Sequence, residues 1–282
     1  MSDAAVSAEL RDVAGPSAVG GGRQRFFELL YLVSVTEFKK AYFGTVLGYV
    51  WSLIRPLMLF AVLLFVFTQI FRVGSQVPHY PVLLLFNVVV FTFFQEASIA
   101  SVTSVLSQEG VVRKTQFPRL VIPLAVVLTG LFNLGLNLIA VFIFILAFGV
   151  GPLWTWLLLP VLILVLTVLT TAVAMLLSSL YVRFRDVEII WSVLVTVLFY
   201  GTPLLYPLEL APERFHELLF LNPLTPLFVE ARHLIIDPGA PGAVSAAGGW
   251  LHLAPSMAIF IGICGCAVAV FNRAAPRIAE EL

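Results

Sequence analysis

Charged side chains are scarce in this sequence, and no Asp, Glu, Lys or Arg occurs between Arg119 and Arg183. Only 11% of the 282 residues are charged, whereas 60% are hydrophobic. A soluble domain of this length must wet most of its surface, so the composition excludes one. A membrane-spanning helix needs roughly 20 apolar residues, and the uncharged stretch has room for two. We therefore predict an all-α integral membrane protein.

Several functional signatures are also missing. Basic and acidic residues are equal in number, sixteen each, so the basic excess that favours a nucleic-acid partner is absent. The chain has no G-x-x-x-x-G-K-[ST] motif with which to bind ATP phosphates. Its histidines and two cysteines lack metal-site spacing, and no G-x-S-x-G motif marks a nucleophile. We expect no catalysis, no metal and no cofactor in this chain.

Six apolar segments have the length that crossing a bilayer requires. Thirteen of the sixteen basic residues fall on the side of the N-terminus, and only Arg72, Arg214 and Arg232 fall on the other. The positive-inside rule then predicts that both termini are cytoplasmic, in a multi-pass protein of the cytoplasmic membrane. The predicted spans are Trp51 to Phe71, Tyr80 to Leu106, Leu120 to Phe148, Leu153 to Tyr181, Val187 to Tyr206 and Leu251 to Asn272.

The cytoplasmic segments outside the spans differ in character. Residues 1–22 and 274–282 are expected to be tails that flank a transmembrane domain over 49–273. Residues 23–48 repeat apolar side chains near helical spacing, which favours an amphipathic helix in the membrane interface. A cytoplasmic extension of the first span is the alternative. The connection 107–118 is long enough for a short helix to which a partner protein could bind. A solvated loop is an equally good interpretation of this segment.

On the outer side, residues 207–250 combine six prolines with short apolar runs that cannot cross a bilayer. This pattern favours re-entrant helices between the fifth and sixth spans, which need protein or water to satisfy their backbone groups. A small extracellular cap is the alternative. Glu96 is the one carboxylate well inside a predicted span, and we interpret it as a neutral or hydrogen-bonded interior residue, with a functional role as the alternative.

Five motifs in register carry a family resemblance. The segment from Tyr42 through Gly48 and Trp51 to Pro56 resembles the entry to the first span in membrane subunits of type 2 ABC exporters. The resemblance is to the polysaccharide, O-antigen and teichoic-acid exporters. The other landmarks follow in order: Phe117-Pro118-Arg119 with Pro123, Arg183-Phe184-Arg185-Asp186, Thr202-Pro203-Leu204-Leu205-Tyr206, and Asn222-Pro223-Leu224 followed by Arg232.

The resemblance implies a homodimer that binds two copies of a separate cytoplasmic ATPase, which holds the ATP and Mg. A lipid-linked cell-surface polysaccharide would pass along the dimer interface. A related exporter subunit for a drug or other small lipophile is the alternative, and an intramembrane enzyme would need an acid or histidine cluster that the sequence lacks. The loop 107–118 would transmit nucleotide-driven closure through Gln108, Glu109, Arg113, Lys114 and Phe117.

Two further sets of candidate residues follow. Many family members carry basic residues beside the motif tyrosine, but here Ala41 and Phe43 flank Tyr42. The candidate lipid-phosphate contacts are therefore the inner-side cations Arg55, Arg119, Arg183 and Arg185, unless these only set the topology. Sugar rings stack on aromatic faces, so about two of a set of aromatics are expected to line the channel: Phe91, Phe93, Phe94, Phe199 and Tyr200.

Overall fold

The computed structural model describes residues 23–42, 50–73, 77–108, 110 and 118–274. Every regular element in these segments is a helix, as predicted. Five apolar helices are long enough to cross a membrane. They are α2 with the short π-helix η1 (Val50–Phe65 and Val66–Ile70), α3 (Tyr80–Val102), α6 (Val121–Ala147), η3 with α7 (Trp154–Leu158 and Leu159–Arg183), and α12 (Trp250–Ala274).

The fifth predicted span is shorter than expected. The apolar helix α8 covers Val187–Gly201, and the chain leaves the helical conformation at Thr202, where ψ is 141°. The residue before a proline is disfavoured in the helical region, and Pro203 follows here. Five of the six predicted spans are thus matched by long helices. The remaining one, the fifth in chain order, stays a prediction because α8 has only 15 residues.

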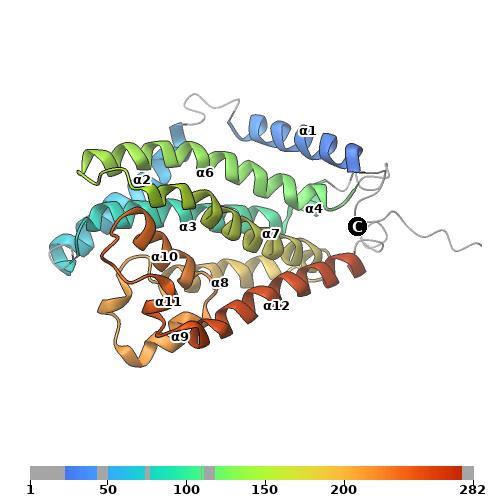
Figure 1. Cartoon of the computed structure of the whole chain (residues 1–282). Coiled ribbons are helices and arrows are strands. Elements are labelled where there is room, and N and C mark those ends of the chain that lie inside the picture. The colour runs from blue at the N-terminus through green and yellow to red at the C-terminus, as the bar shows by residue number, and fades with distance from the viewer. Residues whose placement is uncertain (1–22, 43–49, 74–76, 109, 111–117, 275–282) are drawn as a thin grey trace, which may run out of the picture.

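The two ends of the bundle carry different elements (Figure 1). One end has α1 (Arg23–Tyr42), the single-turn α4 (Ser104–Ser107) and the last turns of α12. The other end has α9 (His216–Leu221), α10 (Thr225–Ile235) and α11 (Ala243–Ala246), with the 3-10 turns Leu208–Leu210 and Glu213–Phe215 before them.

The first helix packs against one of the long apolar helices. α1 packs lengthwise on the first half of α6 (Figure 1). The Thr129 hydroxyl lies 3.3 Å from the Ser34 carbonyl, and one turn further on the Phe38 ring stacks on Phe132 at 6.2 Å. One face of α1 is therefore covered by α6, while the large apolar side chains Phe27, Tyr31 and Leu32 are exposed, so an interfacial position for residues 23–48 stays a prediction.

α3 is the central helix of the bundle. It contacts α6 and α7 along much of its length and also touches α2 and α8. Its side chains from Val82 to Phe91 are almost continuously buried. By contrast, α2, α8 and α12 are peripheral, with large apolar side chains such as Val62, Val193 and Ile261 exposed.

Candidate functional site

The segment after α8 returns into the bundle, and side chains of the spans satisfy its backbone carbonyls. The Tyr80 hydroxyl donates to the Leu205 carbonyl at 2.6 Å, and Asn87 Nδ2 donates to the Leu204 carbonyl at 2.9 Å. Both acceptors sit where the helix has ended and no intrahelical donor is available. A non-helical backbone can lie at membrane depth only with such partners, because lipid offers none.

The far end of α10 is held in the same way. Thr155 donates its hydroxyl to the Leu234 carbonyl, and the Trp156 indole donates to the Ile235 carbonyl at 2.9 Å. The orphan carbonyls at the end of a helix otherwise face water. Here a second span, through η3, supplies the donors and fixes the position of α10.

Asn222, in one of the family motifs, joins the two ends of the segment between α8 and α10. Asn222 Nδ2 donates to the Thr202 hydroxyl at 2.7 Å, and its Oδ1 accepts from the Leu224 amide at 3.0 Å. The asparagine thus joins the end of α8 to the start of α10, next to Pro203 and Pro223. These sequence landmarks meet in space because they form one junction.

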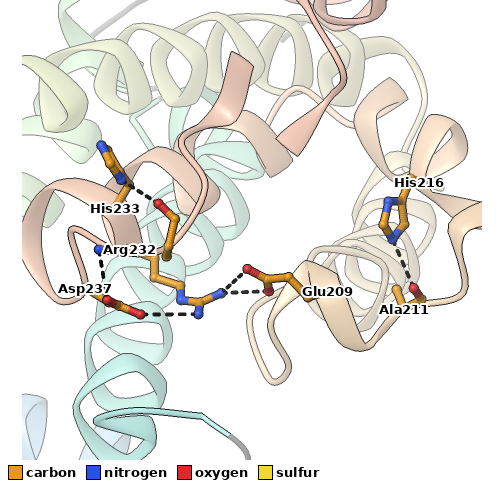
Figure 2. Close-up of polar contacts among 8 residues, drawn as sticks. Glu209, Ala211, His216, Arg232, His233 and Asp237 are labelled. Carbon is orange, nitrogen blue, oxygen red and sulfur yellow. Dashed lines mark hydrogen bonds and ion pairs between the residues drawn. The ribbon is translucent and has the colours of Figure 1, made fainter. Parts of the chain in front are cut away.

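Arg232 joins the loop before α9 to α10 and the residues that follow it (Figure 2). Its guanidinium donates to both carboxylate oxygens of Glu209, at 2.9 and 2.8 Å, and lies 3.6 Å from Asp237. The arginine side chain is only 14% exposed, while Glu209 is 43% exposed. The neighbouring His233 Nδ1 contacts the Ala240 carbonyl at 2.7 Å. A bidentate pair fixes orientation as well as distance, so the loop before α9 is locked to α10.

The predicted channel aromatics form a core cluster instead of a lining. The Phe91 ring is fully buried and packs on Phe94, Phe199 and Phe228 with centroids 5.8, 5.3 and 6.4 Å away. Phe93 and Phe94 are buried as well. Burial among helices of the same chain removes these rings as channel candidates in this conformation. Tyr200 is 62% exposed and is the candidate of the set whose ring is available.

The four candidate phosphate contacts do not form one type of site. Arg55 is exposed on α2, and Arg183 and Arg185 are exposed at the turn between α7 and α8. The Arg185 guanidinium lies 5.0 Å from the Tyr181 ring centroid. Arg119 is 2% exposed, so its side chain is enclosed by protein and does not reach a lipid surface here.

Most of the predicted coupling residues lie outside the described part of the chain. Glu109, Arg113, Lys114 and Phe117 belong to this group, as does Gly48 of the entry motif. Gln108 follows α4, at the end of the bundle that carries α1. Of the entry motif, Trp51 is 49% exposed on α2, and Pro56 is buried inside the same helix.

A polar cavity between α1, α3 and α6 was not predicted. It has a volume of about 320 Å³, and its walls include Glu96, Thr129 and Asn133. Glu96 therefore faces a cavity as an exposed side chain that interacts electrostatically with Arg55, so its interpretation as a hydrogen-bonded interior residue is wrong. The signal available in the sequence was the four-residue spacing of Thr129, Asn133 and Asn137, which places all three on one face of a helix.

The amino-acid sequence is similar to known proteins of one family. The model of the ABC-2 type transporter family matches residues 28–236. This chain belongs to that family. ABC-2 type transporter proteins of this kind are membrane subunits for transport, which agrees with the apolar helices and with the missing P-loop motif.

Individual members of the ABC-2 type transporter family match over most of their length. Two proteins of Klebsiella pneumoniae named O-antigen export system permease protein RfbA are 31% and 29% identical over 259 residues, which cover 91% of this chain and 95% of each relative. A Myxococcus xanthus protein of the same name is 28% identical over 217 residues, which cover 76% of this chain and 83% of that protein.

Proposed function

We propose that this chain is the membrane subunit of an ATP-driven exporter that moves a lipid-linked O-antigen polysaccharide across the cytoplasmic membrane. The observation that carries the proposal is the end-to-end similarity to O-antigen export permeases, over 91% of this chain. A small lipophilic substrate, the alternative considered from the sequence, has no support from the names of these relatives. The same similarity supports a separate ATPase as the source of energy.

The outer segment supports an exporter with re-entrant helices. Phe228 of α10 packs on Phe91 of α3. Phe91 is eleven residues from Tyr80, the first residue of α3, which is about 16 Å along a helix that rises 1.5 Å per residue. If α3 spans the bilayer, α10 therefore reaches well below the outer surface. The donors from Tyr80, Asn87 and Trp156 provide what a backbone at that depth needs. In our proposal this segment shapes the exit of the glycan path.

The peripheral helices support assembly as a homodimer. On α8, the apolar side chains Ile189, Val193 and Val197 are more than half exposed, and on α2 the same holds for Val62 and Phe65. We assign these faces to the second copy and to lipid, with the channel between the copies. The partner ATPase would bind at the end that carries α1 and α4, through the connection 107–118.

The first test is biochemical. Purified alone, the chain should hydrolyse no ATP, and hydrolysis should appear when it is purified with a co-expressed ATPase subunit. In cells that lack the chain, lipid-linked glycan should accumulate inside and disappear from the surface, as measured with a lectin or antibody. Robust hydrolysis by the isolated chain, or normal surface glycan without it, would contradict the proposal.

The second test is topological. After replacement of Cys264 and Cys266, single cysteines are introduced at Glu213 and Asp186, both exposed residues at opposite ends of the bundle. An impermeant thiol reagent added to whole cells should label the cysteine at 213 and not the one at 186. Permeabilised cells, in which both should react, are the control. The opposite pattern would show that the positive-inside assignment is wrong.

A further inference from the structure

The cavity between α1, α3 and α6 is larger than structural water requires. Its volume of about 320 Å³ is roughly ten times the share of one water molecule in the liquid. It lies within the size range of small-ligand sites. The α3–α4 side contributes Glu96, Thr103 and Ser107, and α6 contributes Thr129 and Asn133. Polar groups inside a membrane domain are costly, and they commonly mark substrate paths.

A narrower cavity continues from the same walls and ends at an unsatisfied acceptor. The two cavities share Glu96 and Asn133, and the narrow one also touches Asn137. Asn137 is 6% exposed, and its Nδ2 donates to the Asn133 carbonyl and side-chain oxygen at 2.9 and 3.2 Å. Its Oδ1 is buried and has no hydrogen-bond partner. The narrow cavity has a volume of about 20 Å³, so a water molecule or a single hydroxyl group has room to supply the missing donor.

The hydroxyl groups of the wall cannot provide many donors. Thr129 donates to the Ala125 carbonyl at 2.8 Å, and Ser104 and Ser107 donate at 2.8 Å to carbonyls three residues earlier. Their protons are thus used by backbone carbonyls of the protein, and their oxygens remain as acceptors. The Glu96 carboxylate adds acceptor capacity. The side-chain amides of Asn133 and Gln108 in the same wall can donate as well as accept, so the wall suits a ligand whose groups do both, as hydroxyl groups do.

The charge of the cavity argues against a phosphate as this ligand. Glu37 and Glu96 both line it, and its described walls contain no Lys, Arg or His. A phosphate would therefore find no cation in these walls, and the nearby charge of Arg55 already interacts with Glu96. Sugar hydroxyls are neutral, and each can donate to a carboxylate or an amide oxygen.

We propose that this cavity is a recognition site for a sugar unit of the exported glycan, which it binds through the sugar hydroxyl groups. The proposal rests on the proposed function, because we identify the hydroxyl-bearing ligand with a sugar of the exported glycan. The site lies within one protomer, between α1, α3 and α6, and is separate from a channel between two copies.

The test uses the full chain with its co-expressed ATPase in nanodiscs of phosphatidylcholine and phosphatidylglycerol, which exclude ammonium-bearing ethanolamine lipids. ATP hydrolysis is titrated with undecaprenyl phosphate carrying one glucose, and separately with undecaprenyl phosphate. For the wild type, the glucosylated lipid should have a half-maximal concentration lower by about fivefold, the effect of roughly one hydrogen bond. Asn137→Leu and Glu96→Gln should bring this ratio close to one without changing the response to the bare lipid.

Gln95→Leu is the matched control, because Gln95 precedes Glu96 on α3 and is not in the wall of either cavity. It should keep the wild-type ratio. Glu96→Gln guards against a folding defect, since Glu96 has no hydrogen bond to the described residues. Unchanged ratios in both cavity variants would overturn the inference, as would a wild type that does not distinguish the two lipids. Either result leaves the proposed function intact if cells lacking the chain lose surface glycan.

Discussion

Helices α2 and α3 have similar apolar composition and opposite surroundings. Their mean hydropathies are 2.2 and 1.9, yet 11% of the most apolar stretch of α2 is buried inside the protein, against 78% for α3. In water, apolar residues are sorted by burial, but in a membrane lipid is as apolar as the protein interior. Hydropathy therefore identifies a span without showing which neighbours it contacts.

Polar residues distinguish the two helices better. α3 contains Asn87, Ser98 and Ser101, all buried, and Asn87 and Ser98 bond to distant parts of the chain. The corresponding apolar window of α2 has fewer such groups, and its Thr68 donates only to the carbonyl one turn earlier. A polar side chain within a span thus marks the face that meets other protein segments.

The largest expected effect comes from a large-to-small change on each helix. Phe91→Ala on α3 should lower the free energy of unfolding by about 3 kcal/mol, because its buried ring contacts several others and leaves a cavity. Phe65→Ala on α2 removes a ring that is 62% exposed and should change it by less than about 0.5 kcal/mol. Unfolding in mixed detergent micelles measures both, and equal losses would remove the distinction between the helices.

A smaller effect is expected from the hydrogen bond that joins α3 to the segment after α8. Tyr80→Phe keeps the ring and removes the hydroxyl that donates to the Leu205 carbonyl, which should cost about 1 kcal/mol. Tyr200→Phe is the matched control on an exposed ring. The same micelle assay applies. A neutral Tyr80→Phe would indicate that water or another group satisfies the carbonyl of Leu205.

The smallest effect is expected at the outer surface. Arg232→Gln breaks the pair with Glu209, but that carboxylate is 43% exposed and partly screened, so the loss should be about 0.5 kcal/mol. Arg214→Gln, where the guanidinium only lies over the Phe215 ring, is the control. Hydrogen exchange of the loop before α9 should report the change more clearly than global unfolding. Protection that stays at the wild-type level would show that Arg232 does not hold this loop.

Much of the fold follows from the sequence because each span is a local property. The predicted segment Leu120 to Phe148 matches α6 within a residue at each end, and Leu251 to Asn272 matches α12 within two. A long apolar run in lipid must satisfy its backbone internally, so helix is the available structure. The early end of α8 depends on Pro203 and was missed because the apolar run continues beyond it.

The site was predicted less well, because side-chain direction is a tertiary property. Phe91 and Phe94 suited a channel by type, but the structure surrounds them with α8 and α10. Arg119 suited a headgroup contact by its place next to a span and is buried. The amphipathic pattern of 23–48 predicted a helix, which is confirmed over Arg23–Tyr42, whereas the contact of this helix with α6 was not predicted.

By itself, the sequence determined that this protein is a helical membrane protein without a P-loop motif, because composition and length alone meet the demands of the bilayer. Five ordered motifs also identified its family. Only the tertiary structure decided that Asn87 and Tyr80 hold the chain after α8, and that Glu96 and Asn137 share a polar cavity. These residues are far apart along the chain or carry no motif, and only helix packing brings their side chains to one place.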